Sequence, residues 1–357
     1  MTKIFGGITS KIDEFKALNQ QDKMTYIKEL LINNSLYIFM IIAIIGIQIV
    51  NPTFLSSASI INIISLSAAN LPIALGIAGC IVLTGTDLSA GRIVGLTACV
   101  SAALLQASGY ANKMFTGVDT MPIIVAILVV IAIGAIVGFV NGFCVAKFSL
   151  HPFIVTLGTQ LIVYGVLLIF LMQGDNNGQA ISGLDVGFTS FVTGSILTIG
   201  DRGIPNFVWF AILITILMWF IWNKTKFGKN MFAVGSNPEA ANVSGVNVTR
   251  TIIIVFVLAG IMYGLTGFIE SARIGSNSAA TGLNYELDAI AACVIGGVSF
   301  VGGIGKIRGV IIGVVLLRII FIGLTFLSID SSMQYIIKGL IILVACALDM
   351  RKYLVRK

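Results

Sequence analysis

Ten runs of apolar residues dominate this chain, and they constrain its fold more than any other feature. The hydrocarbon core of a bilayer is about 30 Å thick, so about 20 apolar residues can cross it as a helix. Backbone groups inside a bilayer must find hydrogen bonds within the protein, which favours helices there. We therefore predict an all-α integral membrane protein with about ten transmembrane helices. The predicted spans are 36–51, 60–83, 92–107, 121–140, 153–172, 206–222, 251–271, 286–300, 309–327 and 333–349.

The composition supports this class. Hydrophobic residues make up 57% of the 357 residues and charged residues 10%, whereas soluble domains carry about 25% charged residues. The net charge is +7, but the basic residues cluster at the edges of the apolar runs. This distribution argues against a nucleic-acid-binding role and points to membrane topology.

The orientation follows from the positions of Lys and Arg, because loops on the cytoplasmic side carry an excess of them. Seventeen of the 22 basic residues fall in segments that ten spans would leave on one side. We predict that both termini are cytoplasmic and that 108–120 and 173–205 are outer loops, the second with a short interfacial helix. The seventeen are five lysines of the N-terminal tail, Arg92, Lys147, Lys224, Lys226, Lys229, Arg250, Lys306, Arg308, Arg351, Lys352, Arg356 and Lys357.

The predicted organisation is one membrane domain with polar ends. Residues 1–34 lack the apolar core of a signal peptide and are predicted to be a cytoplasmic tail. Residues 35–350 form the transmembrane domain, which includes a cytoplasmic loop at 223–250. Residues 351–357 form a second cytoplasmic tail.

The loop 223–250 contains a helix-sized piece with signals at both ends. Asn237 can cap the helix, Pro238 suits its first position, Glu239 suits its first turn, and Gly245 can end it. We predict that this piece docks on a separate cytoplasmic ATPase that drives transport; the alternative is an ordinary capped loop helix. The residues predicted for this contact are Asn237, Pro238, Glu239, Ala240, Ala241, Val243, Ser244 and Gly245.

A polar stretch, TGTDLSAGR (84–92), interrupts the chain between the second and third spans. Asp87 or Ser89 could cap the third helix by accepting hydrogen bonds from its first amides. The alternative is that this broken segment, buried in protein, lines the solute path or an inner gate. The residues predicted for the path or gate are Thr86, Asp87, Ser89, Asn70, Gln160 and Tyr164.

Charged residues inside membrane spans are usually paired or functional. Glu270 and Arg273 are one helical turn apart and can bridge one another. Arg318 lies in the middle of the ninth span, and we predict an ion pair with Glu270 or Asp288. A role for Arg318 in the solute path is the alternative.

Signals for catalysis and for metal binding are weak. The stretch GGIGK (302–306) has Phe300 where a phosphate-binding loop needs Gly, and Ile307 where it needs Ser or Thr. His151 is the one histidine, and it suits a helix start better than a metal cluster. The five cysteines lie in or beside apolar runs without a CxxC pair. We predict no enzymatic activity, no cofactor and no metal site in this chain.

Glycines recur at every fourth position in several spans, most clearly at Gly134, Gly138 and Gly142. Such spacing lets helix backbones approach closely in lipid. It indicates either packing within the chain or an interface between subunits. Spans two to five and seven to ten are also expected to form two related halves of opposite orientation.

At these residues the chain resembles the membrane permease subunits of ATP-binding-cassette sugar importers, specifically the ribose/galactose group. DLS-G, NPEAA--SG and YELDAIAA mark the sugar group. GTDLSAGR, WNKTKFGKN and DAIAACV-GGVSF are most similar to its galactose/methyl-galactoside branch. The matching stretches are NPTFLS (51–56), TGTDLSAGR (84–92), PFIVTLGT (152–159), WNKTKFGKNMFAVGSNPEAANVSGVNV (222–248), YELDAIAACVIGGVSFVGG (285–303) and QYIIKGLIILVACALD (334–349).

The resemblance implies a type II-like importer permease of the bacterial cell membrane that pairs as a homodimer. It implies a neutral monosaccharide as solute, either galactose, a methyl galactoside or glucose, delivered by an extracytoplasmic sugar-binding protein. A cytoplasmic double-cassette ATPase would bind ATP and Mg²⁺, and the family's coupling helix maps onto 237–245. The nearer alternatives are a permease for ribose, another sugar or branched-chain amino acids. A secondary transporter, which would need coupling carboxylates in the membrane, is the more distant one.

Overall fold

The computed structural model describes residues 19, 22, 24, 35–199 and 202–354. The predicted tail 1–34 therefore lies almost wholly outside the described residues. Every predicted apolar span corresponds to a helix, because each run is long enough to satisfy its own backbone hydrogen bonds. These helices are α3 (Ser35–Val50), α4 (Ser57–Val82), α5 (Ala90–Leu104), α6 (Ile123–Phe148), α7 (Pro152–Leu171), α9 (Asn206–Lys224), α12 (Val248–Ile274), α13 (Tyr285–Ile295), α14 (Ile307–Phe326) and α15 (Ser331–Leu354).

Six helices in the described part of the chain are long and apolar enough to cross a membrane, which makes this a multi-pass membrane protein. They are α4, α6, α7, α9, α12 and α14. The other four predicted spans fold as helices with shorter apolar stretches. α5 has 15 residues and α13 has 11, so each covers only part of a bilayer.

The loop 173–205 departs from a purely helical fold. The predicted short helix is present as α8 (Val186–Thr193), whose first turn is capped by Asp185 accepting from the Phe188 amide at 3.2 Å. Beyond it, β1 (Ser195–Ile199) and β2 (Arg202–Pro205) pair antiparallel, with Ile199 opposite Arg202. The all-α prediction was wrong for this hairpin, which a loop at a membrane edge can form without crossing the bilayer.

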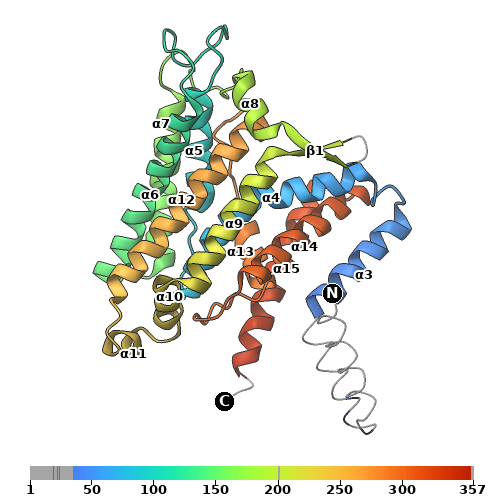
Figure 1. The fold of residues 1–357 in the computed structure, drawn as a ribbon, viewed down its shortest axis with the longest axis vertical. Helices are drawn as coiled ribbons and strands as arrows, with labels where there is room; N and C mark the ends of the chain where they lie inside the picture. The colour runs from blue at the N-terminus through green and yellow to red at the C-terminus, as the bar shows by residue number, and fades with distance from the viewer. Residues whose placement is uncertain (1–18, 20–21, 23, 25–34, 200–201, 355–357) are drawn as a thin grey trace.

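The core is built around α12, which packs against α6, α5 and α4 (Figure 1). Within their most apolar stretches, 67% of α4 and 61% of α12 is buried in the protein, against 22% of α6 and 28% of α7. A helix that is apolar on all sides and mostly exposed is stable only in lipid. The helices α4 and α12 therefore form the centre, and α6 and α7 form an outer layer.

Glycines bring α6 and α12 into close contact. A β-carbon on Gly134 would overlap the carbonyl oxygen of Gly260, and a β-carbon on Gly138 would overlap that of Phe256. Gly264 faces Val130 in the same way. Small residues at such crossings allow van der Waals contact between backbones. Of the two predicted roles for the glycine pattern, the structure shows packing within the chain.

The helices α4–α7 and α12–α15 have equivalent contacts, as expected for two related halves. The short helix α5 packs on α12 of the other half, and the short helix α13 packs on α4. α5 also contacts α6 and α7, as α13 contacts α14 and α15. The long first helices of both halves, α4 and α12, contact each other at the centre.

The two ends of the molecule differ. The segments that connect α5 to α6 and α7 to α8 project from one end (Figure 1). Two further helices, α10 (Lys226–Ser236) and α11 (Pro238–Val243), lie at the opposite end, where the C-terminal part of α15 also points. We call this second end the α11 end.

Candidate coupling site and membrane path

The helix predicted at 237–245 is present as α11. The Asn237 side chain accepts a hydrogen bond from the Ala240 amide at 2.9 Å. Pro238 follows at the first helical position, where its missing N–H leaves no bond unmade. Glu239 in the first turn places a negative charge near the amide end of the helix dipole. The start of α11 agrees with the sequence prediction.

Gly245 ends α11 through its left-handed backbone conformation, with φ at +83°. The Val246 amide donates to the Ala241 carbonyl at 3.0 Å, and the Gly245 amide donates to the Asn242 carbonyl at 2.9 Å. This pair of bonds is the Schellman arrangement, which favours glycine at that position. A β-carbon on Gly245 would meet nothing within 4 Å. Glycine is therefore favoured at this position by its backbone conformation and not by a lack of space.

The predicted docking surface of α11 divides into two sides. Val243 is 90% exposed, and Ala240 and Glu239 are exposed beside it. Ala241 is 5% exposed and packs inward, so it offers little surface here, and its predicted contact with an ATPase stays a prediction. The Ser244 hydroxyl donates to the Ala240 carbonyl at 2.8 Å and serves the helix itself.

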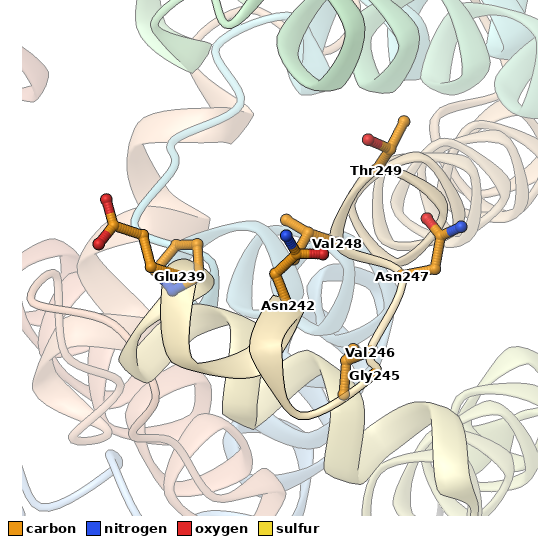
Figure 2. A pocket seen from close by; sticks show the side chains of 8 residues that line it. Glu239, Asn242, Gly245, Val246, Asn247, Val248 and Thr249 are labelled. Atoms are coloured by element: carbon orange, nitrogen blue, oxygen red, sulfur yellow. The ribbon is translucent and has the colours of Figure 1, made fainter.

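An open groove of about 600 Å³ runs between α11 and the first turn of α12. Figure 2 shows Glu239 and Asn242 on one side, with Asn247 and Thr249 of α12 on the other. Asn247 caps α12 by accepting from the Arg250 amide at 2.8 Å. The groove gives the α11 end a concave surface beside an exposed helix.

The sequence analysis missed α10, which joins α9 to α11. Its start is capped by Thr225, whose hydroxyl accepts from the Gly228 amide at 3.1 Å. Met231 and Val234 are buried on its inner face. Their helical spacing with Phe227, after a threonine, was a signal that could have revealed this helix.

The end of α10 meets two other segments in a backbone contact that we call the junction (Val82, Gly235 and Gly303). The Gly303 amide donates to the carbonyl of Val82, the last residue of α4, at 2.8 Å. A β-carbon on Gly235 would overlap the same carbonyl oxygen, and one on Gly303 would overlap the Ser236 hydroxyl. The stretch GGIGK therefore packs on α10 and α4, and α11 is linked to the end of α4 through α10.

The segment after α4 is held by a buried polar network. Asp87 accepts hydrogen bonds from the Ser89 amide at 3.0 Å and the Ser89 hydroxyl at 2.6 Å. Asn141 of α6 donates to the same hydroxyl at 2.9 Å. All three residues are fully buried. The Ser89 side chain makes no capping bond to α5, so that prediction was wrong: Asp87 and Asn141 already engage the hydroxyl.

Thr86 lies next to α7. The Thr156 hydroxyl of α7 bonds both to the Thr86 carbonyl at 3.3 Å and to the Leu88 amide at 3.1 Å. One side chain thus satisfies a donor and an acceptor of the irregular backbone, which is required for non-helical chain inside a membrane protein. Thr86 itself is half-buried, whereas Asp87 and Ser89 have no exposed surface.

Gln160 and Tyr164 are half-buried one turn apart on α7. The Arg92 guanidinium lies over the Tyr164 ring, 4.1 Å from its centre, and donates to the Ala279 carbonyl at 3.1 Å. Ala279 follows the end of α12 that is far from α11. Arg92 thus contacts the segment that follows this end of α12, and its predicted place at the cytoplasmic edge stays a prediction.

The structure contains the predicted ion pair of Glu270 and Arg273. The two Arg273 bonds to the Glu270 carboxylate measure 3.0 Å and 2.6 Å. The Tyr285 hydroxyl donates to the same carboxylate at 3.1 Å. Glu270 is fully buried, so these three bonds offset the cost of removing its charge from water.

Arg318 pairs with Asp288, at 3.4 Å, and not with Glu270, which resolves the alternative that the sequence left open. The other Asp288 oxygen lies 2.6 Å from the Lys338 ammonium, a partner that the sequence analysis missed. Asn70 lies beside this pair, on α4, and is not grouped with Gln160 and Tyr164 on α7. The predicted path residues therefore fall into separate groups.

Within 35–199 and 202–354, together with the few described residues before them, there is no group of three or more His, Cys, Asp or Glu side chains that could hold a metal ion. The five cysteines are free in this structure.

Comparisons with known proteins agree with this architecture. Residues 59–346 match the family described as the permease component of the branched-chain amino acid transport system. No solved structure matches the chain. The galactose/methyl galactoside import permease of Escherichia coli K12 is 46% identical over 342 residues, which cover 96% of this chain and 99% of that one.

More distant relatives are permeases for other sugars. The ribose import permease of Haemophilus influenzae is 33% identical, with 89% of this chain and 93% of that one covered. The D-allose transport permease of Escherichia coli K12 is also 33% identical, over 83% of this chain and 84% of that one. From the family match over most of its length and from these relatives, the chain belongs to the family of the branched-chain amino acid transport system permease component.

Proposed function

We propose that this chain is the membrane subunit of an ATP-driven importer for a neutral monosaccharide, with galactose, a methyl galactoside or glucose as its solute. The observation that carries the proposal is the 46% identity with galactose/methyl galactoside import permeases over nearly the whole chain. Ribose and allose permeases match at 33%, which supports sugar transport as the common function and galactose as the nearer solute.

The proposed topology has ten spans with both termini in the cytoplasm. Six long apolar helices and four further helices at the predicted spans support the count. The α11 end then faces the cytoplasm, and the loops before α6 and α8 face outward. An extracytoplasmic sugar-binding protein would dock on the outer loops, and a second copy of the chain would complete the membrane path.

The proposed coupling runs through α11. A cytoplasmic double-cassette ATPase, which binds the ATP and Mg²⁺, would contact the exposed side of α11 and the groove beside α12. Movement of α11 would pass through α10 to the junction at the end of α4, and from there to the segment that contains Thr86, Asp87 and Ser89. The contacts of the ATPase differ between its nucleotide states, and this difference drives the change.

The proposed path passes two separate groups of residues, Thr86, Gln160 and Tyr164 at or beside α7, and Asn70 on α4. These side chains are polar and neutral, and they suit hydrogen bonds to hydroxyl groups. Asp87 and Ser89 are buried and bonded to one another, so their role is to hold the irregular segment in shape. Solute selection would fall mainly to the binding protein, because the path offers few charged contacts.

Transport of branched-chain amino acids is the second candidate, and the family description favours it. Competition experiments separate the candidates. In a strain without its own galactose uptake, we express the chain with its cognate ATPase and binding protein and measure radiolabelled galactose uptake. Methyl galactoside and glucose should compete strongly, ribose weakly and leucine not at all. Preferential uptake of leucine or ribose would refute the galactose assignment.

A further inference from the structure

A small cavity with three polar lining residues lies where α4, α13 and α14 meet. Asn70, Asp288 and Arg318 line it, together with the Phe321 ring and four aliphatic side chains. Its volume is about 10 Å³, which is room for about one water molecule. Charged side chains between membrane helices are usually paired or functional, so the three polar residues on this otherwise apolar cavity call for an explanation.

Asn70 presents an acceptor without a donor. Its side-chain amide donates to the Leu66 carbonyl at 2.9 Å, but its carbonyl oxygen is buried and makes no hydrogen bond among the described residues. The residue is 7% exposed and lines the cavity. A buried acceptor without a partner is destabilising. The oxygen is therefore placed for a donor that the chain itself does not supply.

Arg318 presents donors on the same cavity. It lies roughly 16 Å along α14 from Ile307, near the middle of the helix. A guanidinium has five N–H donors, and Arg318 makes one hydrogen bond in the described structure, to Asp288 at 3.4 Å. Lys338 holds the second Asp288 oxygen at 2.6 Å. The cluster thus has two cations for one carboxylate, which leaves donors of Arg318 free.

A hydroxyl group matches this arrangement, because it can donate to the Asn70 oxygen while accepting from Arg318. Neighbouring hydroxyls of one sugar ring can make both bonds at once, with an apolar face of the ring toward Phe321. We propose that Asn70 and Arg318 contact the solute hydroxyls on the membrane path, and that Asp288 and Lys338 position Arg318. This inference rests on the proposed function in sugar import.

The cavity is closed in this conformation. A monosaccharide is much larger than one water molecule, so α4 and α14 must separate before the solute enters. An importer that alternates between states requires such a change, and the polar cluster would then be exposed to the path in the open state. In the closed state, the ion pair of Asp288 with Arg318 and Lys338 holds α13, α14 and α15 together.

The test uses the complete complex of permease, ATPase and binding protein in vesicles. Galactose and its 2-, 3-, 4- and 6-deoxy analogues are each offered at concentrations that saturate the binding protein. The variants are Asn70→Leu, Arg318→Met and the conservative Arg318→Lys. The matched control is Arg273→Lys, because Arg273 is also in an intramembrane ion pair but uses its donors on Glu270, and lysine keeps a cation beside that buried carboxylate. The readouts are maximum uptake rate and basal ATP hydrolysis.

We expect Asn70→Leu and Arg318→Met to lower galactose uptake about ten-fold or more, which is the usual size of a lost charge-assisted or buried hydrogen bond. Basal ATP hydrolysis should persist, and Arg318→Lys should recover part of the uptake. The wild type should discriminate against the analogue that lacks the contacting hydroxyl, and each variant should lose that discrimination at one position. Arg273→Lys should keep the wild-type pattern.

Two outcomes would overturn the inference. In the first, uptake and the analogue pattern are unchanged in both variants. In the second, each variant lowers the uptake of every analogue by the same factor as the uptake of galactose, which indicates that Asn70 and Arg318 have a structural role only. Failure of the proposed function is distinguishable from both, because the wild-type complex would then transport none of the sugars.

Discussion

Asn237 holds the first turn of α11 through one hydrogen bond, to the Ala240 amide at 2.9 Å. The helix has six residues, so it has few other bonds to keep it folded. Asn237 is exposed, and its side chain therefore contributes through capping rather than through core packing. A substitution here tests whether the folded form of α11 matters for transport.

For Asn237→Ala, we expect the loss of the cap to cost about 1 kcal/mol of local helix stability. That would reduce the folded population of an already marginal helix about five-fold. Uptake per ATP hydrolysed should fall to a similar extent, measured in vesicles with the full complex. Asn237→Asp keeps a capping oxygen and should transport almost normally. Equal transport by both variants would show that the cap has no role in coupling.

Single residues also show where sequence reasoning stops. The capping of α11 and the ion pair of Glu270 and Arg273 were predictable, because both depend on residues within one or two turns of a helix. The Asp288 contacts with Arg318 and Lys338, and the position of Arg92, depend on which helices pack together. A single sequence carries no direct signal for contacts between residues far apart in the chain.

The junction of α10, α4 and the segment before α14 depends on glycines. Gly235 sits against the Val82 carbonyl, where a β-carbon would overlap it. Since both partners are backbone, neither can move aside as a flexible side chain would. Because of this close approach, we expect α10 and the end of α4 to move as one unit. This unit connects α11 with the polar stretch 84–92, which follows α4.

We expect Gly235→Ala to strain the junction by about 1–3 kcal/mol, in the range of overpacked cores. Uptake should fall about ten-fold while ATP hydrolysis continues, since the ATPase is a separate protein in our account. Gly46→Ala is the matched control: Gly46 is exposed on α3, and its β-carbon would meet nothing within 4 Å. Membrane yield of both variants is measured by quantitative blotting. Normal uptake by Gly235→Ala would refute the mechanical role of the junction.

The helices of the membrane domain could be predicted because long apolar runs in lipid have few alternatives to helix. α10 was missed, since its polar residues resemble those of a loop. The β1–β2 hairpin was missed because it lies in a polar loop, where neither hydrophobic alternation nor length gives a clear signal. Where the chain runs outside the bilayer, the constraint that makes spans predictable no longer applies.

The two halves of the protein meet at α4 and α12, which are the most buried of the long helices. Each half places a short helix, α5 or α13, on the long helix of the other half. Residues 84–89 precede α5 of one half, and Asp288 lies on α13 of the other, paired with Arg318 of α14 and Lys338 of α15. Each half therefore has a buried polar group beside its short helix.

We propose that the energy for transport comes from a separate ATPase that acts through α11. The chain alone should therefore be unable to move sugar against a gradient. The same chain, assembled with its ATPase and the sugar-loaded binding protein, should concentrate sugar inside vesicles when ATP is present.

The deciding measurement is sugar accumulation in sealed vesicles, made with the purified chain alone and with the complete complex, with and without ATP. We predict uphill accumulation only in the complete complex with ATP, and loss of that accumulation in the Asn237→Ala variant. Uphill accumulation by the chain alone, driven by a proton or sodium gradient, would contradict the account and support a secondary transporter.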